Sequence, residues 1–334
     1  MKPTGKKSAA AQAKTVVLLA VVALLVLSLG TVVADRARPE PDPPSVTDVA
    51  RTMARAEAES LQSSARELAA NAAPGGMKRA LINTAEVLSR HASQLAAPAP
   101  TSAGPEPSQL PSPIASADAS GTEESGAPPT VRGLVAALEA NAAAMRLDAR
   151  AVKAGMASLL ARTSAQQFVQ AASLADKAGL PVPDLPPVPV SVERADLSGC
   201  HASSPAPGSE RAAALQATFS GLQRTIYAYE VATPRLPMPA FSLSRERLQQ
   251  HKRALEQGEL MLESRCAKVP VAEAAYALPD GFRAKPARGL AKVETDLAAM
   301  YADLVGLSRA DVRAWSISML TRASIAAQQW ENRS

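Results

Sequence analysis

Apolar residues recur at intervals of three and four along most of the chain, which places them on one face of an α-helix. The clearest case is residues 241–266, where Leu248, His251, Leu255 and Leu262 form one stripe. The chain is therefore predicted to be all-α. The spacing predicts eight helical segments: 46–72, 77–96, 131–150, 151–179, 209–232, 241–266, 289–307 and a last one that starts at Ser308.

Residues that disfavour helices separate these segments. A Pro-Gly-Gly sequence at 74–76 breaks the first two helices apart. Residues 97–130 are low in complexity and are predicted to be a disordered insert, and residues 181–206 form a Pro-rich linker. Ser308 and Asp311 have the spacing of a capping box, which predicts the start of the last helix.

The pattern of segments repeats within the chain. His91 aligns with His251 in one pair of similar segments, and Glu139 aligns with Glu294 in another. Four helices in each copy predict two tandem antiparallel four-helix bundles. The long connection between the second and third helices of each copy, at 97–130 and 267–286, corresponds to the crossover of a ferritin-like topology. Three pairs of segments match in the same order at offsets of about 155 to 160 residues: 88–95 with 248–255, 138–145 with 293–300, and 159–168 with 319–330.

An uncharged apolar run at residues 15–34 has about the length needed to span a bilayer. Lysines precede the run, which favours a cytoplasmic N-terminus and an extracytoplasmic C-terminal region. The alternative is a secretory signal peptide cleaved near Ala34, which would leave a secreted protein. We expect the uncleaved anchor, a single-pass transmembrane helix that holds the protein in the cell membrane.

Together these features predict the domain organisation. A cytoplasmic tail, the transmembrane anchor and a short tether precede two helical bundles, which a Pro-rich linker joins. The predicted boundaries are 1–14 for the tail, 15–34 for the anchor, 35–44 for the tether, 45–180 for the first bundle with its disordered insert at 97–130, 181–206 for the linker and 207–334 for the second bundle.

The formal net charge of +5 does not indicate a nucleic-acid-binding surface. Lys2, Lys6, Lys7 and Lys14 all precede the first acidic residue, Asp35, so the rest of the chain is close to neutral. Basic residues interleaved with aromatic residues, as in nucleic-acid-binding surfaces, are absent from the sequence. We therefore expect no nucleic-acid partner, and we interpret the charged residues on the helices as solvated faces.

The chain has two cysteines, Cys200 and Cys266. An even number in an oxidising compartment favours a disulfide. In an antiparallel hairpin the start of one helix lies beside the end of the next, and this geometry agrees with a Cys200–Cys266 bridge. The sequence has no Cys-x-x-Cys, Gly-rich phosphate loop or Gly-x-Ser-x-Gly elbow, and no catalytic residue is predicted from it.

Residues 209–332 carry a set of motifs in a fixed order: TIYAYEVATPRL at 225–236, HKRALE at 251–256, AAYALP at 274–279 and AAQQW at 326–330. With these motifs the region resembles an actinobacterial ferritin-like domain family of unknown function, and the first bundle resembles a more divergent copy. The resemblance implies a ferritin-like fold and a secreted or membrane-attached envelope protein, without a settled activity.

The metal ligands of the ferritin-like class are incomplete in this sequence. Such sites need a Glu from each of two helices and Glu-x-x-His from each of two others. Leucine stands three residues before both His91 and His251, and Gln223-Arg224 stands where the resemblance implies Glu-His. The weak metal-ligand candidates that remain are His251, Glu294, His91 and Glu139. The competing interpretation makes both histidines hydrogen-bonded core residues, so no cofactor is expected.

Three functions follow as hypotheses. The first is a non-enzymatic envelope protein that acts as a structural or interaction module, through helix surfaces that contact an envelope protein or a wall component. The alternative is a metal-dependent oxidase or metal-binding protein of the ferritin-like class. A weaker hypothesis is a protein that binds a small apolar ligand in the aromatic core of the second bundle.

Overall fold

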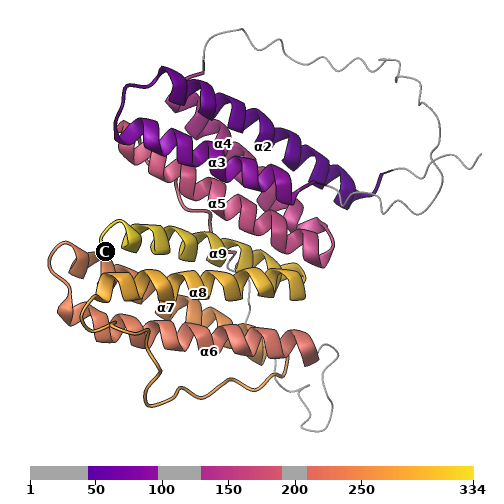
Figure 1. Cartoon of the computed structure of the whole chain (residues 1–334). Helices are drawn as coiled ribbons and strands as arrows, with labels where there is room; N and C mark the ends of the chain where they lie inside the picture. Colours follow the sequence, from indigo (N-terminus) through magenta and orange to yellow (C-terminus); the bar gives the residue numbers. More distant parts are fainter. Residues whose placement is uncertain (1–43, 97–128, 190–208) are drawn as a thin grey trace, which may run out of the picture. The chain divides into compact units, whose positions relative to one another are not determined.

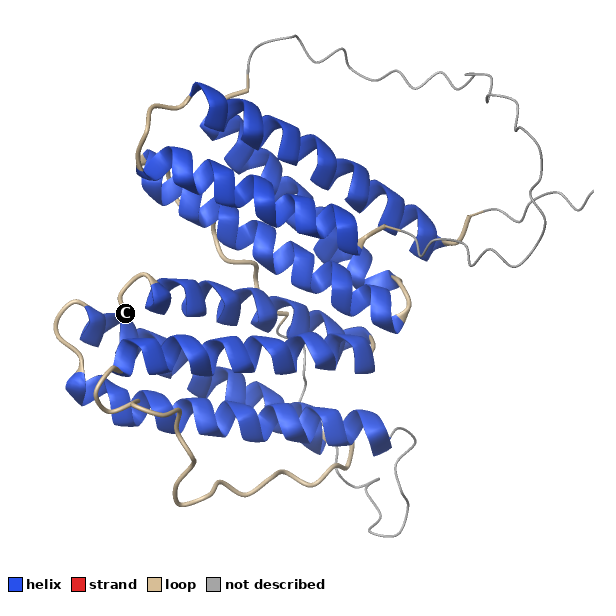
Figure 2. Cartoon of the chain, in the orientation of Figure 1, coloured by secondary structure: helices blue, strands red, loops and turns tan. Residues whose placement is uncertain are grey.

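The computed structural model describes residues 44–96, 129–189 and 209–334. Within these ranges the chain forms eight α-helices and one short 3₁₀ helix, and no strand (Figure 2). The predicted all-α fold is confirmed. The predicted anchor at 15–34 and nearly all of the predicted insert at 97–130 lie outside the described ranges. Among the helices that are described, none is long and apolar enough to cross a membrane.

The observed helices lie within a few residues of the predicted segments (Figure 1). Two of the ends show clear capping signals. Thr130 caps α4 by accepting a hydrogen bond from the Gly133 amide at 3.0 Å, so residue 130 belongs to this helix and not to the insert. Gly179 ends α5 in the left-handed conformation, with φ 64°. The helices are α2 (Val46–Asn71), α3 (Gly76–Gln94), α4 (Val131–Ala151), α5 (Ala154–Ala178), α6 (Ser209–Ala232), η2 (Thr233–Arg235), α7 (Ala240–Glu263), α8 (Pro286–Leu307) and α9 (Ala310–Glu331).

The predicted capping box at Ser308 and Asp311 was wrong. The Ser308 hydroxyl donates backwards to the Leu304 carbonyl at 2.5 Å, so it closes α8 instead of opening α9. Asp311 forms an ion pair with Arg265 at 2.8 Å. Ser308 thus bonds to the preceding turn of α8, and Asp311 bonds to a residue distant in the sequence. The spacing of the two residues alone does not reveal either partner.

Two sets of helices differ in how they fill their cores. Leucine and alanine dominate between α2, α3, α4 and α5, for example Leu81, Leu88 and Leu138. Aromatic residues fill the space between α6, α7, α8 and α9, among them Tyr229 and Trp330. The leucine and alanine core needs close helix approach, whereas the aromatic core buries larger apolar surfaces per residue.

Helix α5 packs against both α8 and α9. Leu160 of α5 belongs to the same hydrophobic cluster as Tyr301 and Trp315. The Ser158 hydroxyl donates to the Ala302 carbonyl at 2.8 Å. The helices therefore form one compact unit, Val46–Ser334, with a continuous apolar cluster, and the domain boundaries drawn from the sequence stay a prediction.

The beginning of the Pro-rich connector lies along α9. Arg322 donates to the Pro186 carbonyl at 3.0 Å, and the Ser318 hydroxyl donates to the Pro187 carbonyl at 3.1 Å. Val188 packs against the shared hydrophobic cluster. Residues 181–189 thus cover part of the surface of α9, while residues 190–208 lie outside the described chain.

Arg313 is a buried arginine that joins distant parts of the chain through carbonyl oxygens alone. Its Nε donates to the carbonyls of Val305 and Ser308 at 3.1 and 2.9 Å. Its Nη1 donates to the carbonyls of Val152 and Arg150 at 3.0 and 3.3 Å. One guanidinium therefore satisfies carbonyls at the end of α8 and at the turn between α4 and α5.

We predict that Arg313→Met lowers the free energy of unfolding by about 2–4 kcal/mol, because several buried carbonyls lose a charged donor. Urea denaturation measures this loss. Arg309→Met is the matched control, since Arg309 is exposed and should change stability by less than about 0.5 kcal/mol. Equal losses in the two variants would show that the buried contacts of Arg313 contribute nothing specific.

Candidate functional site

Four polar-tipped side chains meet in the core of the C-terminal helices, one from each helix. Tyr229 comes from α6, His251 from α7, Glu294 from α8 and Trp330 from α9. Glu294, Tyr229 and Trp330 are fully buried at 0% exposure, and His251 is exposed by only 5%. The four residues are called the core network below.

Short hydrogen bonds connect the core network. The Tyr229 hydroxyl donates to Glu294 Oε1 at 2.6 Å, and His251 Nε2 lies 2.7 Å from the same oxygen. Trp330 Nε1 donates to the Tyr229 hydroxyl at 2.7 Å. The Tyr229 ring also packs on the His251 ring, with centroids 5.1 Å apart. One carboxylate oxygen and one hydroxyl therefore tie together all four helices.

The electrostatics of the core network follow from burial. A carboxylate in an apolar core is strongly unfavourable unless donors surround it, so Glu294 depends on Tyr229 and His251. Burial, followed by the nearby Glu294 charge and the hydrogen bond to it, raises the pKa of Tyr229 well above its usual value. The phenol therefore stays protonated and remains a donor to Glu294 at every physiological pH.

The sequence pattern explains why Glu294 points inward. It stands four residues after Leu290 and three before Leu297, and both leucines are buried. A residue at that position of α8 is directed to the core whatever its polarity. His251 and Glu294 are two of the weak metal-ligand candidates named from the sequence, and the structure brings them together at 2.7 Å.

Tyr229 and Trp330 were missed as site residues. Both stood on predicted apolar stripes and were counted only as core. A usable signal existed, because the hydroxyl of a buried tyrosine and the N–H of a buried tryptophan need hydrogen-bond partners. Two such residues on the same face as a buried histidine and glutamate therefore indicate a polar network.

His91 and Glu139 do not form a counterpart of the core network. His91 is buried, Glu139 is half-buried, and no hydrogen bond or ion pair links them in the described residues. Side-chain amides join the helices here instead. The Asn141 amide of α4 donates to Gln167 Oε1 of α5 at 2.9 Å. The Thr84 hydroxyl of α3 donates to Gln170 Oε1 of α5 at 3.0 Å.

The donor set does not fit the dinuclear metal cage of the ferritin-like class. Such a cage takes four carboxylates and two histidines from facing helices. The core network offers one carboxylate and one histidine, while α6 supplies a phenol and α9 an indole, which has no lone pair for a metal. Across the described ranges, no group of three or more His, Cys, Asp or Glu side chains is placed to hold a metal ion.

Cys266 follows the end of α7, is exposed and is disulfide-bonded. Its predicted partner, Cys200, lies outside the described residues. The Cys200–Cys266 pairing therefore stays a prediction.

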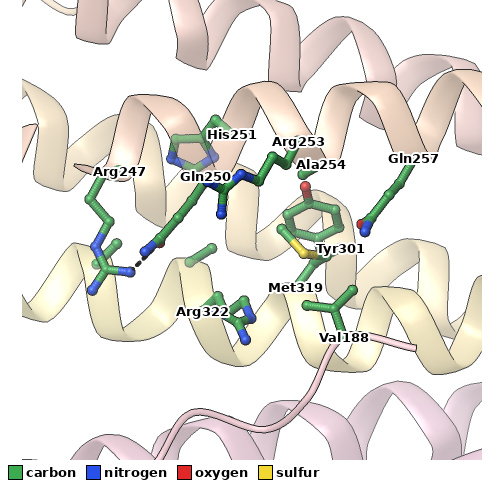
Figure 3. A pocket seen from close by; sticks show the side chains of 12 residues that line it. Val188, Arg247, Gln250, His251, Arg253, Ala254, Gln257, Tyr301, Met319 and Arg322 are labelled. Carbon is green, nitrogen blue, oxygen red and sulfur yellow. Dashed lines mark hydrogen bonds between the residues drawn. The ribbon is translucent and has the colours of Figure 1, made fainter. Parts of the chain in front are cut away.

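A cavity of about 190 Å³ adjoins the core network between α7 and α9 (Figure 3). His251 lines it, together with three arginines and several apolar residues. The interpretation of the helix charges as solvated faces was wrong for two of these arginines. Arg247 is buried and Arg322 is half-buried, because tertiary contacts from α9 and from the 181–189 segment cover them.

Comparison with protein families finds a match in the C-terminal region. Residues 214–334 match the family model described as Domain of unknown function (DUF4439). The C-terminal region carries a DUF4439 domain. This family is of the ferritin-like type, so the resemblance is confirmed in part, while the actinobacterial origin and the AAYALP motif stay predictions. Neither a curated protein nor a solved structure matches the chain.

Gln223 of the DUF4439 domain holds a loop, where the resemblance implied a metal-binding carboxylate. Its Nε2 donates to the Pro270 carbonyl at 3.0 Å, and its Oε1 accepts from the Tyr276 hydroxyl at 3.2 Å. The Tyr276 ring packs on Tyr227 of α6, with centroids 5.8 Å apart. The AAYALP sequence at 274–279 is thus docked onto α6 through Tyr276.

The first half of the chain contains a buried histidine whose protonation is strongly disfavoured. Burial, and next the positive charge of Arg90, lower the pKa of His91 from 6.5 to about 4. Below pH 6.5 the unfolded chain therefore binds a proton at His91. The folded protein binds this proton only when the pH falls to about 4. The neutral His91 ring therefore contributes its full share of the free energy of unfolding above pH 6.5. This share is lost as the pH falls from 6.5 toward 4.

We predict that His91→Gln removes part of the acid destabilisation. Between pH 7 and pH 4.5 the wild-type protein should lose about 2–3 kcal/mol more unfolding free energy than the variant, since a one-unit pKa shift corresponds to 1.36 kcal/mol. Urea denaturation at both pH values measures the difference. Parallel losses in the two proteins would mean that His91 is protonated as readily in the folded state as in the unfolded chain.

Proposed function

We propose that this chain is a membrane-anchored, extracytoplasmic protein with two ferritin-like four-helix bundles, acting as a non-enzymatic binding module of the cell envelope. The observation that carries the proposal is the core network. The core network forms a hydrogen-bonded cross-link at the centre of α6–α9. Metal-dependent proteins with a ferritin-like fold hold their metals in the corresponding part of the bundle core.

The contacts of Glu294 support a structural role for the network. Its Oε1 already accepts from Tyr229 and contacts His251, so the shortest contacts of this carboxylate, the only buried one in the described residues, hold helices together. A metal cage uses several carboxylates to offset the metal charge, and those carboxylates are expensive to bury without it. A bundle whose buried carboxylate is matched by hydrogen-bond donors, as Glu294 is, is suited to a stable scaffold.

The sequence supports the location. Residues 15–34 have the length and composition of an anchor, with lysines on the N-terminal side. A disulfide at Cys266 fits an oxidising compartment. Under this proposal the partner is an envelope protein or a wall component that contacts the helix surfaces.

The alternative function, a metal-dependent oxidase or metal-binding protein, also has an observation in its favour. Glu294 Oε2 and His251 Nδ1 are buried and have no hydrogen-bond partner within the described chain. Two donors alone leave most of a metal coordination sphere empty, which is why the structural role is preferred.

The test compares the metal content of the full-length, detergent-purified chain with that of two variants. After incubation with Fe(II) or Mn(II) and desalting, we predict well under one metal atom per chain by plasma mass spectrometry. His251→Ala should leave that content unchanged and lower the free energy of unfolding by about 1–3 kcal/mol, because a buried hydrogen bond is lost.

His91→Ala is the matched control, a buried histidine outside the core network. One metal per chain in the wild type and the His91 variant, with loss in the His251 variant, would overturn the non-enzymatic proposal. That result would establish the metal-binding alternative.

A further inference from the structure

The cavity between α7 and α9 carries an unusual concentration of positive charge. No aspartate or glutamate lies among the described residues that surround it, and Tyr301 of α8 and Val188 of the connector complete its wall (Figure 3). The lining residues of interest are three arginines and a histidine, which are Arg247, Arg253, Arg322 and His251, and an apolar group, which includes Ala254, Met319 and Ala323.

Arg247 is a buried cation held by neutral partners. It is exposed by only 5%. Its Nη1 donates to Gln250 Oε1 at 2.6 Å, and its Nη2 donates to Gln329 Oε1 at 2.7 Å. Its Nε is buried and lacks any acceptor in the described chain. The amides fix the guanidinium in place, and Arg247 forms no ion pair with a carboxylate of the described residues.

Arg322 faces the same cavity in a similar state. Its Nη2 donates to the Pro186 carbonyl at 3.0 Å, while its buried Nε has no acceptor among the residues described. Burial, and after it the charge of Arg247, lower the pKa of Arg322. The two guanidiniums thus repel each other, and Arg253 adds a third cation at the exposed side. None of the three forms an ion pair within the described ranges.

Two more polar atoms of the lining lack partners in the part of the chain that is described: His251 Nδ1 and the Tyr301 hydroxyl. Buried polar groups without partners are uncommon in folded proteins. Four of them line this one cavity, and three are N–H or O–H donors. A ligand that accepts hydrogen bonds and carries negative charge would satisfy the three donors, which are Arg247 Nε, Arg322 Nε and the Tyr301 hydroxyl.

The apolar half of the lining limits the kind of anion. A cavity of about 150 Å³ is known to hold a benzene ring, and this cavity is about 190 Å³. Ala254, Met319 and Ala323 offer contacts to a ring or short alkyl body. An inorganic anion would leave those apolar contacts unused. A carboxylate attached to a ring or a short alkyl chain would contact both the cationic and the apolar part of the lining.

We propose that this cavity binds a small organic monocarboxylate, with the carboxylate against Arg247 and Arg322 and the apolar body against Met319 and Ala323. His251 belongs to both the cavity and the core network, so the bound anion would lie next to the ring that contacts Glu294. The inference goes beyond the proposed envelope role and holds whether or not that role is correct.

The test is calorimetric titration of the full-length, detergent-purified chain with benzoate. We expect one site per chain, a rise in melting temperature with benzoate, and binding at least tenfold weaker for the neutral analogue benzamide and for inorganic phosphate. Arg247→Gln and Arg322→Gln should each weaken benzoate binding at least tenfold. Ala323→Leu, which fills the cavity without changing charge, should weaken it as well.

Arg245→Gln is the matched control, because Arg245 lies on the same helix, is exposed and is not part of the lining. It should leave benzoate binding unchanged. Absence of benzoate binding to the wild-type chain, equal binding of benzamide, or unchanged binding by both the Arg247 and the Ala323 variants would overturn the proposal. Phosphate binding as strong as benzoate would also overturn it, because the apolar body would then contribute nothing.

Discussion

A buried carboxylate must be surrounded by hydrogen-bond donors, and this constraint organises the C-terminal helices. Glu294 has no exposure to solvent, and its Oε1 is met by the Tyr229 hydroxyl at 2.6 Å and by His251 Nε2 at 2.7 Å. Those two groups come from α6 and α7, and Trp330 Nε1 of α9 donates to the tyrosine hydroxyl in turn. The position of one carboxylate therefore fixes the mutual positions of four helices.

The same histidine connects the network to the cavity. Its Nε2 lies 2.7 Å from Glu294 Oε1, and the same residue lines the arginine-rich cavity. Arg247 and Glu294 act on Tyr229 in opposite directions, Arg247 lowering and Glu294 raising its pKa. The core thus holds a separated negative and positive region, which explains how a scaffold network and an anion site can share one residue.

The helices were predictable because apolar spacing and Pro or Gly breaks are local signals. The spacing of Glu294, four residues after Leu290, allowed an inward position for its side chain. The rest depends on tertiary contacts. Glu139 aligned with Glu294 yet stays half-buried without contacting His91, since aligned positions in a diverged repeat need not keep the same burial. Arg247 and Arg322 come from distant segments, so their convergence on one cavity has no signature in the sequence.

The central claim is that Glu294 is held by hydrogen bonds and not by a metal, and a double-mutant cycle measures this directly. Urea denaturation of Tyr229→Phe, Glu294→Leu and the double variant should give a coupling energy of about 1.5–3 kcal/mol, as expected for a hydrogen bond to a charged group. Tyr227→Phe, on the same helix, should be additive with Glu294→Leu. A Tyr229–Glu294 coupling below about 0.3 kcal/mol would contradict the account, because the two residues would then contribute independently.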